Sequence, residues 1–340
     1  THYKRSNPVS GSSSLSVTTW KVGGVWEPIE QLRFRATRSR DIRAPNLNEL
    51  FGPVTSGRVS VIDPQKAGLL VEAVAFSGAN PSLRPEKADT FTIGAVLKPD
   101  WFVRNFSVSV DYFDIKLDGA IATLGSQTIV NRCSSGATEF CPYVTRNAGG
   151  FVTEGRAALN NVNQQKVRGL DIEASYRTEL SAGTQLGLRL LATHYMELST
   201  RDSIGVTDRA GQTGYRGGAT PGVPDWIVDG NIDLSFNKVR LGAHGHFIPK
   251  GKFDVLLVGP EDAGYSITRP DSVNTNRINS RFYLDLSGTV KINDQFEVFG
   301  VINNVLDKEP PRAFSSQGGT NHVWFDTLGR YFKVGVRVTM

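Results

Sequence analysis

The sequence predicts an all-β fold, a transmembrane antiparallel β-barrel, and three observations carry this prediction. Residues 332–340 alternate without a break between apolar side chains and charged or small ones. The same two-residue period recurs in about ten further segments, which is typical of strands with lipid on one face and water on the other. The connections between these segments alternate between short and long. A soluble β-sandwich offers no reason for every long connection to emerge at one end, whereas an outer-membrane barrel does.

The alternating segments come in pairs, each joined by a short turn. We expect strands at residues 15–26, 32–40, 91–97, 106–112, 170–176, 186–195, 226–236, 239–247, 282–290, 296–302 and 332–340. Longer stretches without comparable periodicity lie at 41–85, 119–165, 200–223, 249–280 and 303–328. Because outer-membrane barrels have short periplasmic turns and long external loops, we place these longer stretches outside. Residues 3–14 are polar and rich in Ser, and we expect a loop there.

The amino-acid composition excludes some other classes of protein. The chain of 340 residues has a formal net charge of +5 and 39% hydrophobic residues. No apolar run approaches the ~18 residues that a membrane-spanning helix requires, which excludes a helical membrane protein but not a barrel. No long basic run accompanies the net charge, so nucleic-acid binding is not expected. The chain begins at Thr1 without a Met or a signal peptide, which we interpret as an incomplete N-terminus.

Aromatic residues fall near both ends of the predicted strands, on the face assigned to lipid. Aromatic rings favour the headgroup level of a bilayer, so we predict an aromatic girdle. The alternative is that aromatic residues are simply common in strands. The residues concerned are Trp26 and Trp101 at the periplasmic end, and Tyr112 and Trp226 near the outer end.

Five sequence motifs stand where predicted strands meet long loops. They are LRFRATRSRDIRAPNLNELF at 32–51, NPSLRPEK at 80–87, DYFDI at 111–115, NNVLDKEP at 303–310 and DTLGRYF at 326–332. Together they resemble the TonB-dependent outer-membrane receptor family, in family order and spacing. The last strand also resembles the signal that the barrel-assembly machinery reads in that family, with Lys333, Gly335 and Val338 retained. Met340 stands where the family usually has an aromatic residue.

The resemblance implies a larger protein than this chain. Receptors of this kind have about twenty-two strands around a plugged lumen, with a TonB box facing the periplasm. Residues 1–340 would be a single domain, the C-terminal part of the barrel, with about eleven of those strands. The plug and the N-terminal strands would lie outside this sequence. An open sheet with two unpaired edges is not stable in lipid, which agrees with the chain being a fragment.

The resemblance also implies a function. It is active uptake of a scarce nutrient, siderophore-bound iron or carbohydrate, across the outer membrane of a Gram-negative bacterium. The implied partners are outer-membrane lipid and lipopolysaccharide, TonB acting through the plug, the barrel-assembly machinery, and a small-molecule iron chelate or oligosaccharide. The alternatives are a passive porin, a smaller complete barrel, or an outer-membrane adhesin or enzyme. The sequence lacks the motifs of a nucleophile elbow, a phosphate loop and a zinc protease, so neither catalysis nor a cofactor is expected.

The two cysteines, Cys133 and Cys141, fall in one predicted external loop. An oxidising compartment favours a disulfide between them, and free thiols or a metal pair are the alternatives. A second pair, His244 and His246, lies two positions apart and therefore shares the lumen face of a strand. A metal site there needs a third ligand that the sequence does not supply, so we predict no metal and treat both as polar lumen wall.

Further charged residues are predicted on the lumen wall, where they either neutralise one another or contact the plug or the substrate. They are Arg33, Arg35, Asp111, Asp171, Glu173, Arg189, Asp229, Asp233 and Asp285. Aromatic and cationic residues in the external loops are candidate ligand contacts, because aromatic faces suit sugars and planar chelates and cations suit anionic siderophores. The alternative for each is loop packing. They are Phe140, Tyr143, Tyr215, Arg216, Tyr265 and Trp324.

Overall fold

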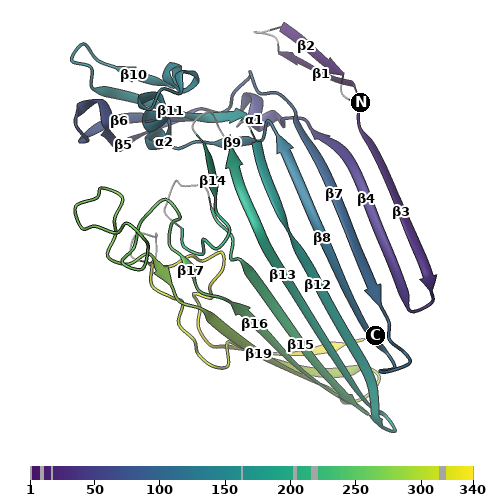
Figure 1. The fold of residues 1–340 in the computed structure, drawn as a ribbon. Helices are drawn as coiled ribbons and strands as arrows, with labels where there is room; N and C mark the ends of the chain where they lie inside the picture. Colours follow the sequence, from purple (N-terminus) through teal and green to yellow (C-terminus); the bar gives the residue numbers. More distant parts are fainter. Residues whose placement is uncertain are drawn as a thin grey trace.

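The computed structural model describes residues 2–7, 11–16, 18–161, 164–201, 205–215, 221–313 and 319–339. One antiparallel sheet of twelve strands dominates the molecule and curves across its width (Figure 1). Its strand order runs β21-β20-β19-β16-β15-β13-β12-β8-β7-β4-β3, with β14 paired to β13. Each strand of that path therefore pairs with its nearest neighbours along the chain, as in an up-and-down barrel wall.

The predicted strands lie in this sheet, except that Leu15 and Ser16 of the first predicted strand belong to a separate two-stranded hairpin. Their bounds are β3 (Trp20–Ile29), β4 (Leu32–Arg43), β7 (Glu86–Leu97), β8 (Phe106–Asp118), β12 (Gln164–Ser181), β13 (Thr184–Arg201), β15 (Trp226–Phe236), β16 (Val239–Ile248), β19 (Arg281–Lys291), β20 (Phe296–Asn303) and β21 (Tyr331–Val338). The twelfth strand is the short β14 (Val206–Asp208). The predicted fold class, an antiparallel barrel sheet, is confirmed.

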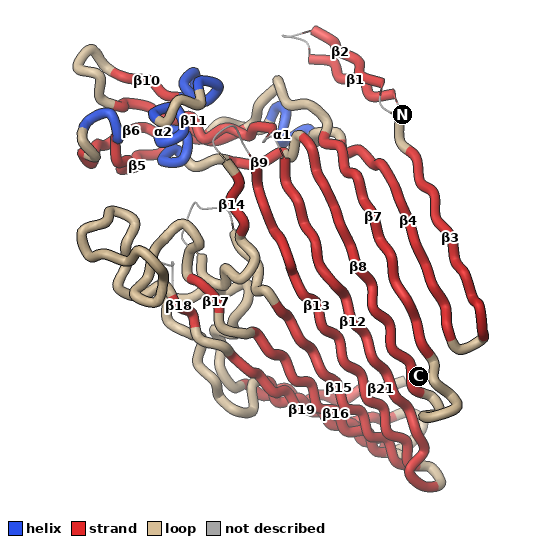
Figure 2. Tube along the Cα trace, viewed as in Figure 1, coloured by secondary structure: helices blue, strands red, loops and turns tan. Residues whose placement is uncertain are grey.

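Short turns lie at one end of the sheet and long loops at the other, as Figure 2 shows. Three of the turns have two residues, 30–31, 182–183 and 237–238. Gly183 (φ 78°) and Asn237 (φ 50°) adopt the left-handed backbone that such tight hairpins need. The end with the long loops is called the outer end below.

The two faces of the sheet differ in chemistry. Large apolar side chains stand exposed on one face, from Val22 and Trp26 on β3 to Phe332 and Val334 on β21, where Val334 is 81% exposed. The opposite face carries the charged residues described below. Exposed apolar side chains over so wide an area need an apolar medium around them.

Two of the long loops fold into a unit of their own, which we call the outer subdomain. The sequence analysis treated residues 41–85 and 119–165 as irregular, and this was wrong. The unit contains α1 (Leu47–Phe51), β5 (Thr55–Asp63), β6 (Leu69–Gly78), β9 (Ile121–Thr123), α2 (Ser126–Ser134), β10 (Val144–Arg146) and β11 (Val152–Asn161), with 3-10 turns at Pro64–Lys66 and Thr138–Tyr143. β11 runs parallel to β6, so strands from the two loops share one sheet.

The outer subdomain has a small apolar core. Val61 and Ala73 from the first loop meet Val130 and Val152 from the second, all at most 4% exposed. α2 covers the sheet with Ile129 and Val130, both 0% exposed. The core explains why these loops are ordered, because burial of apolar surface offsets the entropy of fixing their backbones.

The remaining three loops form a second assembly, which we call the loop cluster. It includes β17 (Gly251–Lys252) and β18 (Arg277–Ile278). Its core contains Ile248, Phe253, Ile278, Tyr283, Ala313 and Phe325. Ile248 and Tyr283 belong to β16 and β19 and lie in phase with His246 and Asp285, on the charged face of the sheet. The loop cluster therefore packs against the charged face near the outer end.

The beginning of the chain departs from expectation. Residues His2–Asn7 (β1) and Gly11–Ser16 (β2) pair as an antiparallel hairpin, where the sequence predicted a loop over 3–14. Among the residues that the structure describes, no helix combines the length and the apolar composition that crossing a membrane requires.

Candidate ligand-binding wall and outer loops

The charged face of the sheet is held together by pairs that cross from strand to strand. Arg35 on β4 donates from Nε to Asp111 on β8 at 2.7 Å. Arg189 on β13 donates to Glu173 on β12 at 2.9 Å. Arg33 also pairs with Glu27. Arg35 and Asp111, and Arg189 and Glu173, are thus pairs of predicted lumen residues, whereas the partner of Arg33 was not predicted.

The Arg35–Asp111 pair reaches over the intervening strand β7 because Gly94 lies between them. Gly94 is the register partner of both residues. A Cβ built at Gly94 would lie 2.0 Å from Asp111 Oδ1. The absence of a side chain here is therefore what lets the two charges meet.

We predict that Gly94→Ala separates Arg35 from Asp111 and destabilises the sheet by about 1–3 kcal/mol, because the new methyl group must displace a side chain. Thermal unfolding of the protein in detergent, followed by circular dichroism, measures this. Gly24→Ala is the matched control, since a Cβ at Gly24 meets nothing within 4 Å. Equal unfolding temperatures for the two variants would contradict the prediction.

Carboxylates and histidines converge further along the wall. Asp229 Oδ1 lies 3.1 Å from His244 Nε2 and 2.8 Å from His246 Nδ1. Asp285 Oδ1 accepts from the backbone N–H of Asn304 at 2.7 Å. Both histidines are thus engaged by a carboxylate. No group of three metal-ligating side chains with the geometry to hold an ion occurs among the described residues.

Two other predicted wall residues lie elsewhere on this face. Asp171 Oδ1 accepts from the hydroxyl of Thr193 at 2.7 Å. Asp233 lines a cavity of about 420 Å³ near the short-turn end, together with Arg177. The wall is therefore polar along its height.

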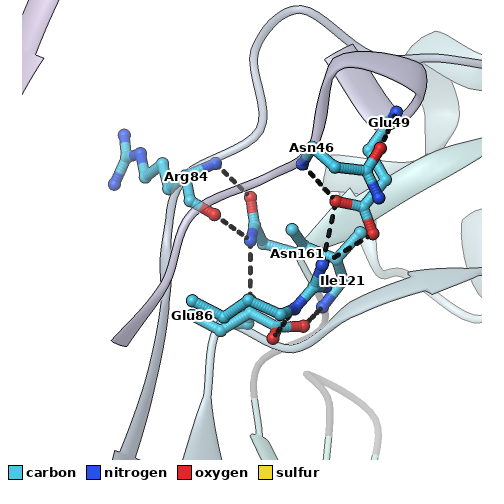
Figure 3. A network of polar contacts seen from close by, with 8 residues as sticks. Asn46, Glu49, Arg84, Glu86, Ile121 and Asn161 are labelled. Atoms are coloured by element: carbon cyan, nitrogen blue, oxygen red, sulfur yellow. Dashed lines mark hydrogen bonds and ion pairs between the residues drawn. The ribbon is translucent and has the colours of Figure 1, made fainter. Parts of the chain in front are cut away.

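At the outer rim, one polar network ties both loops of the outer subdomain to the sheet (Figure 3). Glu86, 6% exposed at the start of β7, accepts from Arg43 Nε and from the backbone N–H of Ile121, both at 2.6 Å. Arg43 also pairs with Glu49 at 2.9 Å. The network thus joins β4, β7 and the second loop at one carboxylate.

Two asparagines extend this rim network. Asn46 caps α1, accepting from Glu49 N while Glu49 Oε2 accepts from Asn46 N. The Asn161 side chain accepts from the backbone N–H of Arg84 and donates to its carbonyl, which closes a two-way clamp. The motif at 80–87, predicted to lie where a long loop meets a strand, is thus also bound to the second loop through Asn161, a contact that the sequence did not predict.

Inside the outer subdomain, one ion pair has a fully buried carboxylate. Asp63 is 0% exposed, and its oxygens lie 2.7 and 3.0 Å from the Arg146 guanidinium. The bonds from Arg146 hold the pKa of the Asp63 carboxyl below its ordinary value, although burial acts in the opposite direction. Nearby, Cys133 and Cys141 are joined by a disulfide.

The predicted loop contacts are divided between two places. Phe140 and Tyr143 belong to the outer subdomain, whereas Tyr215, Tyr265 and Trp324 belong to the other three loops. All five are half-buried. Trp324 packs against the core of the loop cluster. They do not form one aromatic site, and Arg216 lies outside the described residues.

The residues predicted to form the aromatic girdle and the assembly signal lie on strands of the main sheet, except Trp101 and Met340. Trp26 stacks on Phe34 with ring centroids 5.5 Å apart, and Trp226 stacks on His194 at 4.4 Å. Trp101, in the turn before β8, is 68% exposed. Tyr112 lies on β8, and Lys333, Gly335 and Val338 lie on β21. Met340 lies outside the described residues.

Comparison with known families shows to which family the chain belongs. A family model described as TonB dependent receptor-like, beta-barrel, matches residues 1–305. The chain belongs to the TonB-dependent receptor β-barrel family. The resemblance seen in the five motifs is thereby confirmed. This is a family of outer-membrane receptors rather than of enzymes, so the strands of this receptor barrel cross an outer membrane. No curated protein sequence matches the chain.

Solved structures share the fold at low sequence identity. Similar ones are a mutant ferric enterobactin receptor, PfeA, from Pseudomonas aeruginosa, the siderophore receptor PirA from Acinetobacter baumannii, and the FrpB iron transporter from Neisseria meningitidis. Identities are 14%, 13% and 16%, and TM-scores are 0.58, 0.59 and 0.58. The superpositions cover 97%, 97% and 99% of this chain but 41%, 41% and 42% of those chains. The receptor barrel described here thus spans less than half the length of these proteins.

Proposed function

We propose that this receptor barrel takes up siderophore-bound iron across the outer membrane of a Gram-negative bacterium. The proposal rests on two features of one membrane sheet. One face of the sheet is charged, and two folded loop assemblies lie at its outer end. Such an arrangement suits capture of a ligand at the surface followed by passage along a polar lumen. Iron is chosen over carbohydrate because the similar solved structures are named as siderophore or iron receptors.

We further propose that this chain contributes wall and loops, while a plug and more strands come from other parts of a longer protein. Within the described residues, β3 and β21 each pair on one side only. Unpaired edge groups in lipid cost several kcal/mol each, so further strands are needed to close the barrel. In this scheme TonB acts on the plug, and energy coupling lies outside residues 1–340.

Uptake of radiolabelled iron tests the proposal. The complete gene is expressed in an iron-starved Gram-negative host that lacks its own siderophore receptors. We expect saturable uptake of ferric siderophore, and a fall to background in a matched strain without TonB. The control is a host that carries the empty vector.

A passive porin gives the opposite result. Diffusion through an open pore rises linearly with concentration and continues without TonB. Uptake of that form would overturn the proposed function.

A further inference from the structure

The loop cluster contains an open pocket of about 400 Å³ that the sequence analysis did not predict. Its apolar wall contains Phe253, Ile278 and Ala313, which are 5%, 2% and 4% exposed. Apart from Val273, its remaining lining is polar and includes Arg277 and Arg312. The volume is within the range of pockets that bind small molecules.

The pocket is built on a fixed base. Asn276, 0% exposed, accepts from the backbone N–H of Asp254 at 3.1 Å and donates to the carbonyl of Leu257 at 2.8 Å. The backbone N–H of Phe253 donates to the carbonyl of Asn276 at 2.6 Å. These bonds hold the strand that carries Arg277. A pre-formed wall lowers the entropy that a ligand must overcome on binding.

The backbone on both sides of the second arginine, Arg312, is also held by hydrogen bonds. The backbone N–H of Ala313 donates to the carbonyl of Gly319 at 2.6 Å, and Thr320 donates to the carbonyl of Pro311 at 2.8 Å. Arg312 lies between these two anchored positions. Its side chain is exposed, as is that of Arg277.

Other arginines of these loops already have partners. Arg269 pairs with Asp271 at 2.6 Å, and Arg330 pairs with Asp307 at 3.1 Å. Arg281 donates to the carbonyl of Glu309 at 2.6 Å. Within the described ranges, the guanidinium groups of Arg277 and Arg312 make no hydrogen bond or ion pair. The pocket lining contains no Asp or Glu.

Two guanidinium groups without carboxylates, beside an apolar wall, select for one kind of ligand. Each group offers several N–H donors in a plane that matches carboxylate, phenolate or phosphate oxygens. The wall of Phe253 and Ile278 suits the apolar or aromatic part of the same molecule. A neutral ligand would form no ion pair with either guanidinium group and would gain only the contacts with the apolar wall.

We propose that this pocket binds an anionic ligand with an aromatic or apolar portion, through Arg277 and Arg312. The inference rests on the proposed function and names its substrate class: an anionic iron chelate rather than a neutral chelate or a neutral oligosaccharide. The position of the loop cluster, over the charged face at the outer end, puts the pocket on the route from the surface to the lumen.

Binding of two iron chelates to the purified full-length receptor tests the proposal. The probes are an anionic ferric tris-catecholate and a neutral ferric tris-hydroxamate, followed by quenching of tryptophan fluorescence. We expect tighter binding of the catecholate and a weakening of that binding as salt is raised. For the double variant Arg277→Gln/Arg312→Gln, we expect the catecholate Kd to rise by at least about tenfold.

Two further variants keep this test interpretable. Arg269→Gln is the matched control, because Arg269 is an exposed loop arginine whose charge is already paired with Asp271. It is expected to leave the Kd unchanged. Arg277→Lys/Arg312→Lys keeps both charges and is expected to lose less affinity than the glutamine pair, which separates charge from loop folding.

Several results would overturn the inference. One is equal affinity of the wild-type receptor for both chelates, and another is an unchanged catecholate Kd in the glutamine double variant. Loss of lipopolysaccharide binding instead of chelate binding would assign the arginines to lipid phosphates. TonB-dependent uptake of the neutral chelate alone would also contradict this inference, although the proposed function would still stand.

Discussion

Asp63→Ala is expected to destabilise the outer subdomain by about 3–5 kcal/mol, because it leaves a mostly enclosed guanidinium without its counter-charge. The Arg146 side chain is 19% exposed and has little access to water. Apart from Asp63, its guanidinium donates to the carbonyl of Gly150 at 2.7 Å. Asp63 also accepts from the backbone N–H groups of Gln65 and Val152. Removing this carboxylate therefore leaves several hydrogen-bond donors without their acceptor.

Hydrogen–deuterium exchange of the protein in detergent measures this effect. Amides of β5, β6 and β11 are expected to lose protection together, while those of the membrane strands keep theirs. Glu72→Ala is the matched control on the same hairpin. Glu72 and Arg58 are 3.7 Å apart and 75% and 87% exposed, so its loss is expected to cost about 1 kcal/mol or less. Similar exchange in both variants would contradict the prediction.

The same ion pair gives the outer subdomain a pH dependence. Because the pKa of Asp63 is lower in the folded protein than in the unfolded chain, its stabilisation is complete above the unfolded value of about 3.9. The contribution is lost as pH falls through the lower folded value. Acidification below about pH 4 should therefore loosen the wild-type subdomain, whereas Asp63→Ala should show a flatter profile over that range.

Glu86→Ala is expected to release both loops of the outer subdomain from the rim, at a cost of about 2–3 kcal/mol. The carboxylate accepts two short bonds, and hydrogen bonds to charged groups contribute about 1.5–3 kcal/mol. Arg43 is 46% exposed on its side chain and can rehydrate, so the effect stays below that of Asp63. Figure 3 shows how Glu86 and Ile121 lie beside the Asn161 clamp.

Limited proteolysis measures the release. Cleavage within 44–85 and within 119–163 is expected to accelerate together, since one carboxylate holds both loops. Asp118→Ala is the control at the same rim, because Asp118 and Lys116 are 41% and 45% exposed. Acceleration in only one loop would show that Glu86 does not join them.

The sequence by itself determined the membrane sheet. Alternation places Val334 and Val336 on one face and Lys333 and Arg337 on the other, and such a pattern needs no knowledge of distant residues. Turn chemistry is also local, as at Asn237, where a left-handed backbone closes a two-residue hairpin. Strand positions and the ends at which loops emerge follow from these local rules.

Only the tertiary structure decided what the loops do. The pairing of β6 with β11 joins segments about eighty residues apart, and short apolar runs such as those around Val61 do not name their partners. The enclosed pair of Asp63 and Arg146 looks like two ordinary charges in sequence. Arg277 and Arg312, whose guanidinium groups have no partner within the described residues, also look like two ordinary charges in sequence. Whether a charge is paired depends on long-range packing, which is why the sequence could place the barrel wall but not the loop sites.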